Sequence, residues 1–185
     1  MNYTIRRAEA DDARMVALIK NKTWKADYAG ILSPKTLDEL DYEKQVAKLE
    51  KALKDKKGNS HIFVCQNECN EIVGYVQCLI KVNTLQDEDD SFVGATLKGM
   101  EIGRGFYSAL YVLPEFQGKG AGKALFDYMS NFSKQRGIKT ATGYCLVENT
   151  KGMNFHTKNG AKIIAEEDIE TFGESCKEYK LEWQL

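Results

Sequence analysis

The feature that most constrains this chain is a glycine-rich stretch, FQGKGAGKAL at residues 116–125. It follows the apolar run Ala109–Leu113, which predicts a strand that leads into the glycines. After the glycines, apolar residues recur at helical spacing from Ala121 to Phe132, and Gly137 ends the pattern. A strand, a glycine turn and a helix together present unpaired backbone N–H groups and the positive end of a helix dipole. This arrangement is typical of sites that bind phosphate groups.

Two common phosphate-binding motifs do not fit the stretch. A P-loop requires G-x-x-x-x-G-K-[ST], but Gln117 stands at the first glycine position and Ala124 follows Lys123. A dinucleotide fingerprint requires G-x-G-x-x-G, and after Gly118 and Gly120 the third position is Lys123. The stretch therefore disfavours both nucleotide-binding classes.

A third motif fits, because Gln117-x-x-Gly120-x-Gly122 matches Q/R-x-x-G-x-G/A. The segment FYSALYVLPEFQGKGAGKALFDYM resembles the central motif of the GNAT superfamily of N-acetyltransferases, and ENTKGMNFHTKNGAKII resembles its second motif. The resemblance extends over nearly the whole chain and is most specific at residues 106–161. It implies a single domain over residues 1–185 that binds acetyl-coenzyme A through the glycine loop.

Composition sets the broad class of protein. The chain has 185 residues, of which 43% are hydrophobic and 29% charged, and this is enough for one domain with a core. A net charge of -1 disfavours nucleic acid and anionic membranes as partners. No apolar run approaches the ~20 residues of a membrane span, and the N-terminus lacks the apolar stretch of a secretory signal. We therefore expect a cytoplasmic protein with no nucleic-acid or membrane partner.

The five cysteines do not form a metal-binding pattern. Cys65 and Cys69 are four residues apart, but no second pair follows, and the only histidines are His61 and His156. We expect free thiols in a reducing compartment and no metal site.

The remaining segments predict a mixed fold. Strands are expected at residues 3–6, 61–66, 71–82, 105–113, 140–147, 161–165 and 178–185. Helices are expected at residues 8–20, 33–56 (as one helix or two), 121–136 and 149–158. Residues 21–32 are expected to be an irregular connection, and residues 84–99 a solvated loop. The fold class is therefore α/β (mixed α+β). The resemblance further implies a mostly antiparallel sheet of about seven strands, with a splayed parallel pair at 106–113 and 140–147, flanked by about four helices.

The resemblance also assigns residues to acetyl-coenzyme A. The backbone of Tyr111, Val112 and Leu113 would contact the pantetheine arm, and an N–H of Val112 or Leu113 would polarise the thioester carbonyl. Asn149 would make a polar contact to the cofactor, and Phe155 would pack against it. The residues that would hold the pyrophosphate are Gln117, Gly118, Lys119, Gly120, Ala121, Gly122 and Lys123.

The reaction that the resemblance implies is direct attack of a neutral amine on the thioester. His156 stands where the family usually has a tyrosine that protonates the departing thiolate. With an ordinary pKa of ~6.5, a histidine can donate or relay a proton near neutrality. The alternative is that His156 only forms a polar wall and the thiolate leaves unaided. Ser108, Tyr107 and Glu101 are candidates for holding a water or acting as the base, and no motif decides among them.

The acceptor is expected to be a primary amine of a small molecule or a peptide. Trp24 and Tyr28 are candidates for its pocket, although large aromatic residues also suit a core. A different class remains open: a non-catalytic acyl-coenzyme A-binding regulatory module, which the histidine at position 156 favours. The last strand, with Trp183, is a candidate surface for a homodimer.

Overall fold

The computed structural model describes residues 2–54, 59–81, 92–171 and 173–185. Seven strands form one sheet in the order β1-β2-β3-β4-β5-β7-β6. The strands are β1 (Thr4–Arg7), β2 (Ser60–Gln66), β3 (Ile72–Lys81), β4 (Arg104–Val112), β5 (Thr140–Leu146), β6 (Lys162–Thr171) and β7 (Glu174–Gln184). The helices are α1 (Ala13–Asp27), α2 (Pro34–Asp38), α3 (Tyr42–Lys54), α4 (Phe92–Gly99), α5 (Ala121–Lys134) and α6 (Thr150–Lys158). Two 3-10 turns are η1 (Ala10–Asp12) and η2 (Pro114–Phe116).

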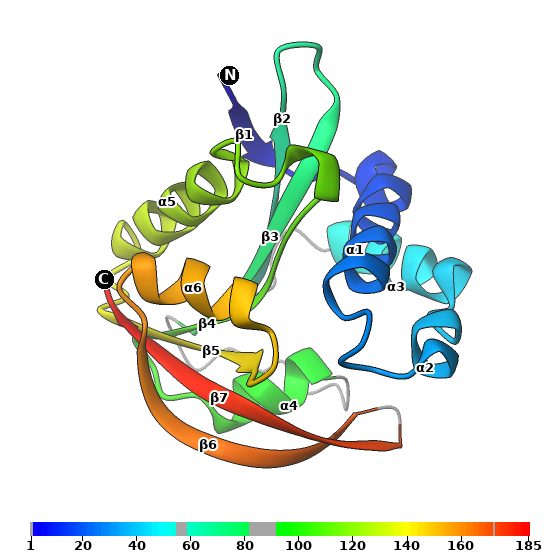
Figure 1. Ribbon diagram of the computed structural model, residues 1–185. Helices are drawn as coiled ribbons and strands as arrows, with labels where there is room; N and C mark the ends of the chain where they lie inside the picture. Colours follow the sequence, from blue (N-terminus) through cyan, green and yellow to red (C-terminus); the bar gives the residue numbers. More distant parts are fainter. Residues whose placement is uncertain (1, 55–58, 82–91, 172) are drawn as a thin grey trace.

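Helices cover both faces of the sheet (Figure 1). α5 packs against β2, β3 and β4, and its residues Leu125 and Met129 are buried in the larger core cluster. α1 packs on β3 and β4 in a second cluster with Val16 and Ile19, and α3 packs against α1. Burying each such aliphatic side chain stabilises the fold by roughly 1.5–3 kcal/mol. The mixed, mostly antiparallel sheet expected from the sequence is confirmed.

The sheet opens between two neighbouring strands. Of the strand pairs that the structure describes, β4 and β5 are parallel, and the others are antiparallel. The pairing of β4 with β5 joins Arg104–Tyr107 to Thr140–Gly143, and it ends at Tyr107 and Gly143. We call the opening between Ser108–Val112 of β4 and Tyr144–Leu146 of β5 the split. The splayed parallel pair that the resemblance implied is thereby confirmed.

The end of β4 turns part of its backbone toward the split. The N–H of Leu113 donates to the carbonyl of Val73 at 2.9 Å. In an antiparallel ladder, this bond makes the neighbouring Gly74 and Val112 a non-hydrogen-bonded pair. The N–H and C=O of Val112 therefore point away from β3, and by the same alternation so do those of Leu110. These groups face the split, where a ligand can reach them.

The first helix is longer than the sequence analysis predicted. α1 continues to Asp27, so the expectation of an irregular connection is wrong for residues 21–27. The physical reason is that Thr23 extends the buried stripe of the helix: its side chain is 3% exposed and donates to the carbonyl of Val112 at 3.3 Å. No glycine or proline interrupts these residues, so nothing local ends the helix at Lys20.

One other segment differs from expectation, because residues 92–99 form α4 where a solvated loop was expected. Residues 84–91 of that predicted loop lie outside the described part of the chain. Within residues 33–56, predicted as one helix or two, the structure has two helices, α2 and α3. The described chain thus has six α-helices where about four were expected.

The hairpin of β6 and β7 is longer than its apolar pattern. β6 reaches Thr171 and β7 begins at Glu174, because their polar residues pair along the ladder even where few are buried. Figure 1 shows this hairpin at one edge of the sheet, curving toward the side of the molecule where α2 lies. There the carboxylate of Glu174 accepts hydrogen bonds from the N–H and the Oγ of Ser33, the N-cap of α2. These bonds fix the far end of the hairpin to the helical side of the molecule.

No helix among the described residues combines the length and the apolar composition needed to cross a membrane.

Candidate functional site

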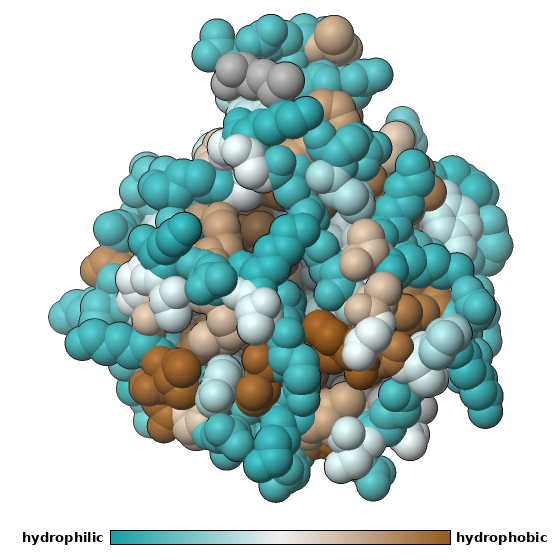
Figure 2. Space-filling view, viewed as in Figure 1, coloured by the Kyte–Doolittle hydropathy of each residue, from teal (hydrophilic) through white to brown (hydrophobic). Residues whose placement is uncertain are grey.

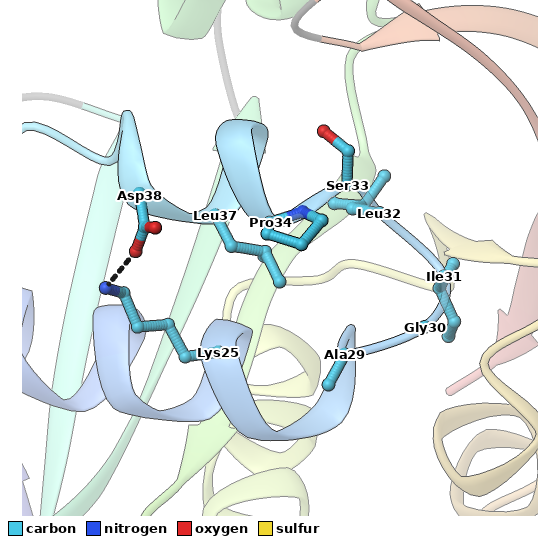
Figure 3. Close-up of a pocket in the computed structure, with 9 residues that line it drawn as sticks. All are labelled: Lys25, Ala29, Gly30, Ile31, Leu32, Ser33, Pro34, Leu37 and Asp38. Carbon is cyan, nitrogen blue, oxygen red and sulfur yellow. Dashed lines mark hydrogen bonds and ion pairs between the residues drawn. The ribbon is translucent and has the colours of Figure 1, made fainter.

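Two cavities in the described part of the molecule are candidates for a ligand site. One, of about 570 Å³, is formed by the end of α1, the following loop and α2. Figure 3 shows its lining, which is largely apolar apart from Ser33 and an ion pair of Lys25 with Asp38 at 2.8 Å. The other, of about 490 Å³, contains the glycine loop and the split. Because the second brings most of the predicted residues together, we take it as the candidate site and call it the cleft.

The cleft lies among elements that are far apart in the sequence. In the view of Figure 1, α6 lies on one side and α1 and α2 on the other, with the sheet between them. Figure 2 shows the same view, with hydrophobic residues at the surface between α6 and α2 on a face that is otherwise largely hydrophilic. The predicted residues that line the cleft are Tyr28, Tyr107, Ser108, Tyr111, Val112, Gln117, Gly118, Gly120, Gly122, Lys123, Asn149, Phe155 and His156. Trp24, Leu113, Lys119 and Ala121 are outside this lining.

The glycine loop has the backbone geometry of an anion site. Gly118 and Gly120 have φ of 71° and 95°, in the left-handed region that favours glycine. Gly120 is the N-cap of α5 and accepts the N–H of Ala124 at 3.0 Å. The N–H groups of residues 121–123 therefore precede the first intrahelical bond and have no acceptor within the helix. They point, with the helix dipole, toward the mouth of the cleft.

The two lysines of the loop contact protein groups. Lys123 bonds to the carboxylate of Asp127 at 2.5 Å, one turn along α5. Lys119 lies over the ring of Phe116, with its Nζ 5.7 Å from the ring centroid. Both side chains are at the surface, so either can turn toward an anion at low cost.

Gln117 takes part in a hydrogen-bond network at the top of the split. Its Nε2 donates to the carbonyl of Val112 at 2.9 Å and to Oδ2 of Asp27 at 3.0 Å. Its Oε1 accepts a hydrogen bond from Lys151, and the Nζ of Lys151 also bonds to Oδ1 of Asp27 at 2.9 Å. The carbonyl of Val112 thus has two donors, Gln117 and Thr23. The side-chain amide of Gln117 is engaged at both ends by protein groups.

The structure distinguishes the two backbone donors proposed for the thioester. Leu113 uses its N–H within the β3–β4 ladder, as described above, and its side chain is 8% exposed. Val112 points its N–H to the split. Of the two, Val112 is therefore the donor that a ligand in the split can meet.

His156 is held between aromatic rings near the end of α6. Its ring lies 5.5 Å from that of Phe155 and 5.4 Å from that of Trp183, both in edge contacts. Its Nδ1 is buried and has no hydrogen-bond partner among the described residues. Burial lowers the pKa of His156 from its ordinary 6.5 to about 4. The ring is therefore neutral at pH 7 and carries no imidazolium proton to donate. The lowered pKa also makes it a weaker base than an ordinary histidine.

The other predicted catalytic groups are Ser108 and Tyr107, which line the cleft, and Glu101, which does not. A register shift between Gln77 and Cys78 leaves Ser108 as a β-bulge, and its Oγ donates to the carbonyl of Gln77 at 3.3 Å. Burial raises the pKa of Tyr107, whose hydroxyl therefore stays protonated. Glu101 is exposed, bonds to Arg104 at 3.2 Å and does not line the cleft.

Two tyrosine hydroxyls, those of Tyr28 and Tyr111, lie on the α1 side of the split. Tyr28 interacts through its hydroxyl with Tyr111 and Asn149, and burial raises the pKa of Tyr28 well above its usual range. Trp24 meets the ring of Tyr28 edge-on at 5.0 Å and stands behind it. The side chain of Asn149 accepts the N–H of Gly152 at 2.9 Å and so caps α6. Tyr28 therefore lines the cleft, whereas Trp24 supports it.

Several residues of the cleft were not singled out from the sequence. They are Thr23, Asp27, Leu110, Phe126, Tyr144, Cys145, Lys151, Lys158 and Trp183 among others. The sequence placed Trp183 on the last strand, as part of a candidate homodimer surface, whereas in the structure its ring forms the wall beside His156. Spacing gives no signal for these residues, because the fold brings them together from α1, β5, α6 and β7.

The cysteines and histidines do not come together. Cys65 is buried and Cys69 is exposed. Within the described ranges, no three His, Cys, Asp or Glu side chains form a group that could hold a metal ion.

Comparison with known proteins identifies the class to which this fold and cleft belong. The sequence model of the Acetyltransferase (GNAT) family matches residues 23–161. This match begins at Thr23 on α1 and contains the glycine loop, most of the second motif and all of the cleft lining except Trp183. The chain belongs to the GNAT acetyltransferase family and is a GNAT-type N-acetyltransferase.

Individual relatives agree with this assignment. The chain is 24% identical over 180 residues to an uncharacterized N-acetyltransferase, YuaI, of Bacillus subtilis, covering 97% of this chain and 92% of the relative. It is 22% identical over 165 residues to a spermidine N(1)-acetyltransferase of Thermoplasma acidophilum, covering 88% and 90%. Among solved structures, the PaiA N-acetyltransferase of Thermoplasma acidophilum in complex with coenzyme A matches with a TM-score of 0.71 at 19% identity, over 100% of both chains. These similarities are to the fold and the sequence of those proteins.

Proposed function

We propose that this protein transfers an acetyl group from acetyl-coenzyme A to a primary amine of a small molecule or peptide by direct attack. The observation that carries the proposal is the position of the glycine loop at the open end of the split. An anion-binding helix N-terminus and a strand with free-facing backbone groups occupy one cleft. A diphosphate joined to an extended amide-bearing arm fits both features at once.

The residues present suit each part of such a donor. The N–H groups of residues 121–123 would hold the diphosphate. Leu110 would pair with the arm through the backbone groups that face the split, and the N–H of Val112 would remain for the thioester. The ring of Phe155 would pack against the arm, since it already lies 3.3 Å from where a Cβ on Gly122 would stand. Titratable groups are not needed for this recognition.

The same geometry suits attack on a thioester. The N–H of Val112 would donate to the carbonyl oxygen as negative charge develops there. Thr23 and Gln117 hold the Val112 carbonyl, and this fixes the end of β4. Placing both reactants in one cleft removes much of the entropic barrier to their meeting. The amine nitrogen forms the new bond to the acetyl carbon as the bond to the thiolate breaks.

His156 is proposed to manage the proton in this reaction. The depressed pKa keeps its ring neutral, with one nitrogen that accepts and one that donates, so the ring can relay the amine's proton to solvent without remaining an imidazolium. We expect His156→Ala to lower turnover at least about tenfold with a modest change in donor affinity. His156→Gln, which keeps polarity without a basic ring nitrogen, should behave in the same way. Near-normal turnover in both variants would assign His156 to the wall and leave proton transfer to water.

The acceptor class is supported by the relatives and not by a single residue. The spermidine N(1)-acetyltransferase of Thermoplasma acidophilum is similar over 88% of this chain. Polyamines, amino-terminal peptides and small monoamines are therefore the first acceptors to test. Tyr28 and Tyr144, on opposite sides of the split, are the aromatic residues that a bound amine would meet.

The alternative is a regulatory module that binds an acyl-coenzyme A without catalysis. It is favoured by one observation, the histidine of depressed pKa at position 156 in place of the family's tyrosine. Measuring release of the coenzyme A thiol with a panel of amines separates the two. Release that depends on both an amine and acetyl-coenzyme A supports the transferase, whereas binding of acetyl-coenzyme A with no release for any amine supports the module.

A further inference from the structure

The ion pair of Asp27 with Lys151 joins two helices at their electrostatically unfavourable ends. Asp27 is the last residue of α1, where the helix dipole disfavours an acid. Lys151 is the second residue of α6, where the dipole disfavours a base. Neither charge stabilises its own helix, and yet the two atoms Nζ and Oδ1 meet at 2.9 Å across 124 residues of sequence. Local helix stability therefore does not account for either residue.

The pair lies at the rim of the cleft, whose lining includes both residues. The side chain of Asp27 is 18% exposed, compared with 63% for Lys151, so the carboxylate is the inner partner. Through its second oxygen Asp27 also accepts from Gln117, which in turn holds the carbonyl of Val112. One carboxylate thus connects α1, the residue that begins the glycine motif, and the first turn of α6. All three of these elements border the position proposed for the donor.

We propose that Asp27 is a positioning residue for the acetyl donor. Its carboxylate holds Gln117 and Lys151 so that the end of β4, the glycine loop and α6 keep a fixed spacing before the donor arrives. The spacing sets how wide the split is at its diphosphate end. Without the carboxylate, Gln117 can turn away from Val112, and Lys151 is no longer held over the cleft. The donor must then order these groups as it binds, which weakens its affinity.

This inference rests on the proposed function and adds a residue that the glycine motif does not contain. It also predicts an unusual combination of effects. Asp27→Asn keeps the shape of the side chain and removes an unfavourable charge from the end of a helix. We therefore expect its melting temperature to be unchanged or slightly raised. Its dissociation constant for coenzyme A should nevertheless rise about fivefold, within the range of coupling found for contacting charged groups.

The molecule offers a matched control in the other cavity. Lys25 and Asp38 form an ion pair at 2.8 Å between α1 and α2, outside the cleft (Figure 3). Asp38→Asn removes an ion pair of the same chemistry and similar length. Its dissociation constant for coenzyme A should stay within about twofold of wild type, as for an exposed pair with no role in binding.

The experiment is calorimetric titration of coenzyme A into wild type, Asp27→Asn, Lys151→Met, the double variant and Asp38→Asn, with a thermal melt of each. If Asp27 and Lys151 act together, the dissociation constant of the double variant should rise by less than the product of the two single increases. In steady-state assays of acetyl transfer, Asp27→Asn should raise the KM for acetyl-coenzyme A and leave kcat within about twofold.

The outcomes are distinct. If wild type binds coenzyme A and Asp27→Asn binds it as well or more tightly, the positioning role is wrong. Equal weakening in Asp27→Asn and Asp38→Asn would also overturn it, because the effect would then be general. If wild type itself binds no coenzyme A, the proposed function is wrong, and the positioning role of Asp27 is then wrong with it.

Discussion

The two halves of β4 have opposite surroundings. Residues Arg104–Tyr107 are bonded on both edges, to β3 and to β5, whereas Ser108–Val112 are bonded to β3 and face the split. The bulge at Ser108 marks the change from one half to the other. In the closed half every backbone group serves the sheet, and the neighbouring side chains are core. In the open half the same strand presents backbone groups to a ligand, so stability and recognition occupy adjacent residues of one element.

The largest effect should come from the closed half. Leu181 of β7 is fully buried and is the register partner of Gly143, which pairs with Tyr107. We expect Leu181→Ala to lower the free energy of unfolding by about 2–5 kcal/mol, because it leaves a cavity in the core. Chemical denaturation measures this change. Ile163→Ala, on the same hairpin but 50% exposed, is the control and should lose less than about 1 kcal/mol.

Donor affinity should change little in Leu181→Ala at a temperature where it is folded. If that variant instead lost coenzyme A binding in proportion to its stability, the closed and open halves would not be independent.

A second effect concerns pH and separates the two histidines. Burial lowers the pKa of His61 and of His156 to about 4, from 6.5. The unfolded chain then binds more protons between these values, so stability is complete above pH 6.5 and falls as pH decreases toward 4. Each histidine should contribute a slope approaching about 1.4 kcal/mol per pH unit in this window.

Single substitutions check the assignment of that slope. His61 packs against Phe132 beneath α5, away from the cleft, whereas His156 borders it. His61→Gln and His156→Gln should each remove about half of the slope between pH 6.5 and 4.5, measured by denaturation at a series of pH values. Turnover should fall in His156→Gln alone. A pH dependence unchanged in both variants would show that neither ring is neutral because of burial.

A smaller effect should come from the open half through its glycine loop. Gly120 and Gly137 both have positive φ, 95° and 77°, and Gly137 lies outside the cleft lining, at the far end of α5. Replacing either by Ala should cost about 1–2 kcal/mol of stability through the same backbone strain. Affinity for coenzyme A should fall about tenfold in Gly120→Ala, because the loop no longer presents its N–H groups. Gly137→Ala should retain wild-type affinity; weakening in both would trace the loss to general instability.

The sequence predicted the parts of this comparison that are local. The glycine motif and the period of α5 lie within twenty residues, and their physics acts over one turn of helix, so both were read correctly. The divergence of β4 and β5 followed from the family resemblance. The length of α1 was missed because the burial of Thr23 depends on β4, which lies 89 residues away.

Other parts of the site depend on contacts that no local pattern encodes. The meeting of Asp27 with Lys151 requires α1 and α6 to be placed on either side of the split. Trp183 lines the cleft because β7 lies next to β5 in the sheet. The depressed pKa of His156 arises from its burial between Phe155 and Trp183, whereas the residue type alone suggested a value near neutrality. The ion pair, the position of Trp183 and the pKa of His156 all depend on contacts between residues that only the complete fold brings together.

Hydrogen–deuterium exchange with and without coenzyme A tests the difference between the two halves of β4 most directly. The account predicts new protection of the amides of residues 121–123 and of Val112. The amides of Arg104–Tyr107, already bonded within the sheet, should not change. Protection that appears elsewhere and spares the glycine loop and Val112 would contradict it.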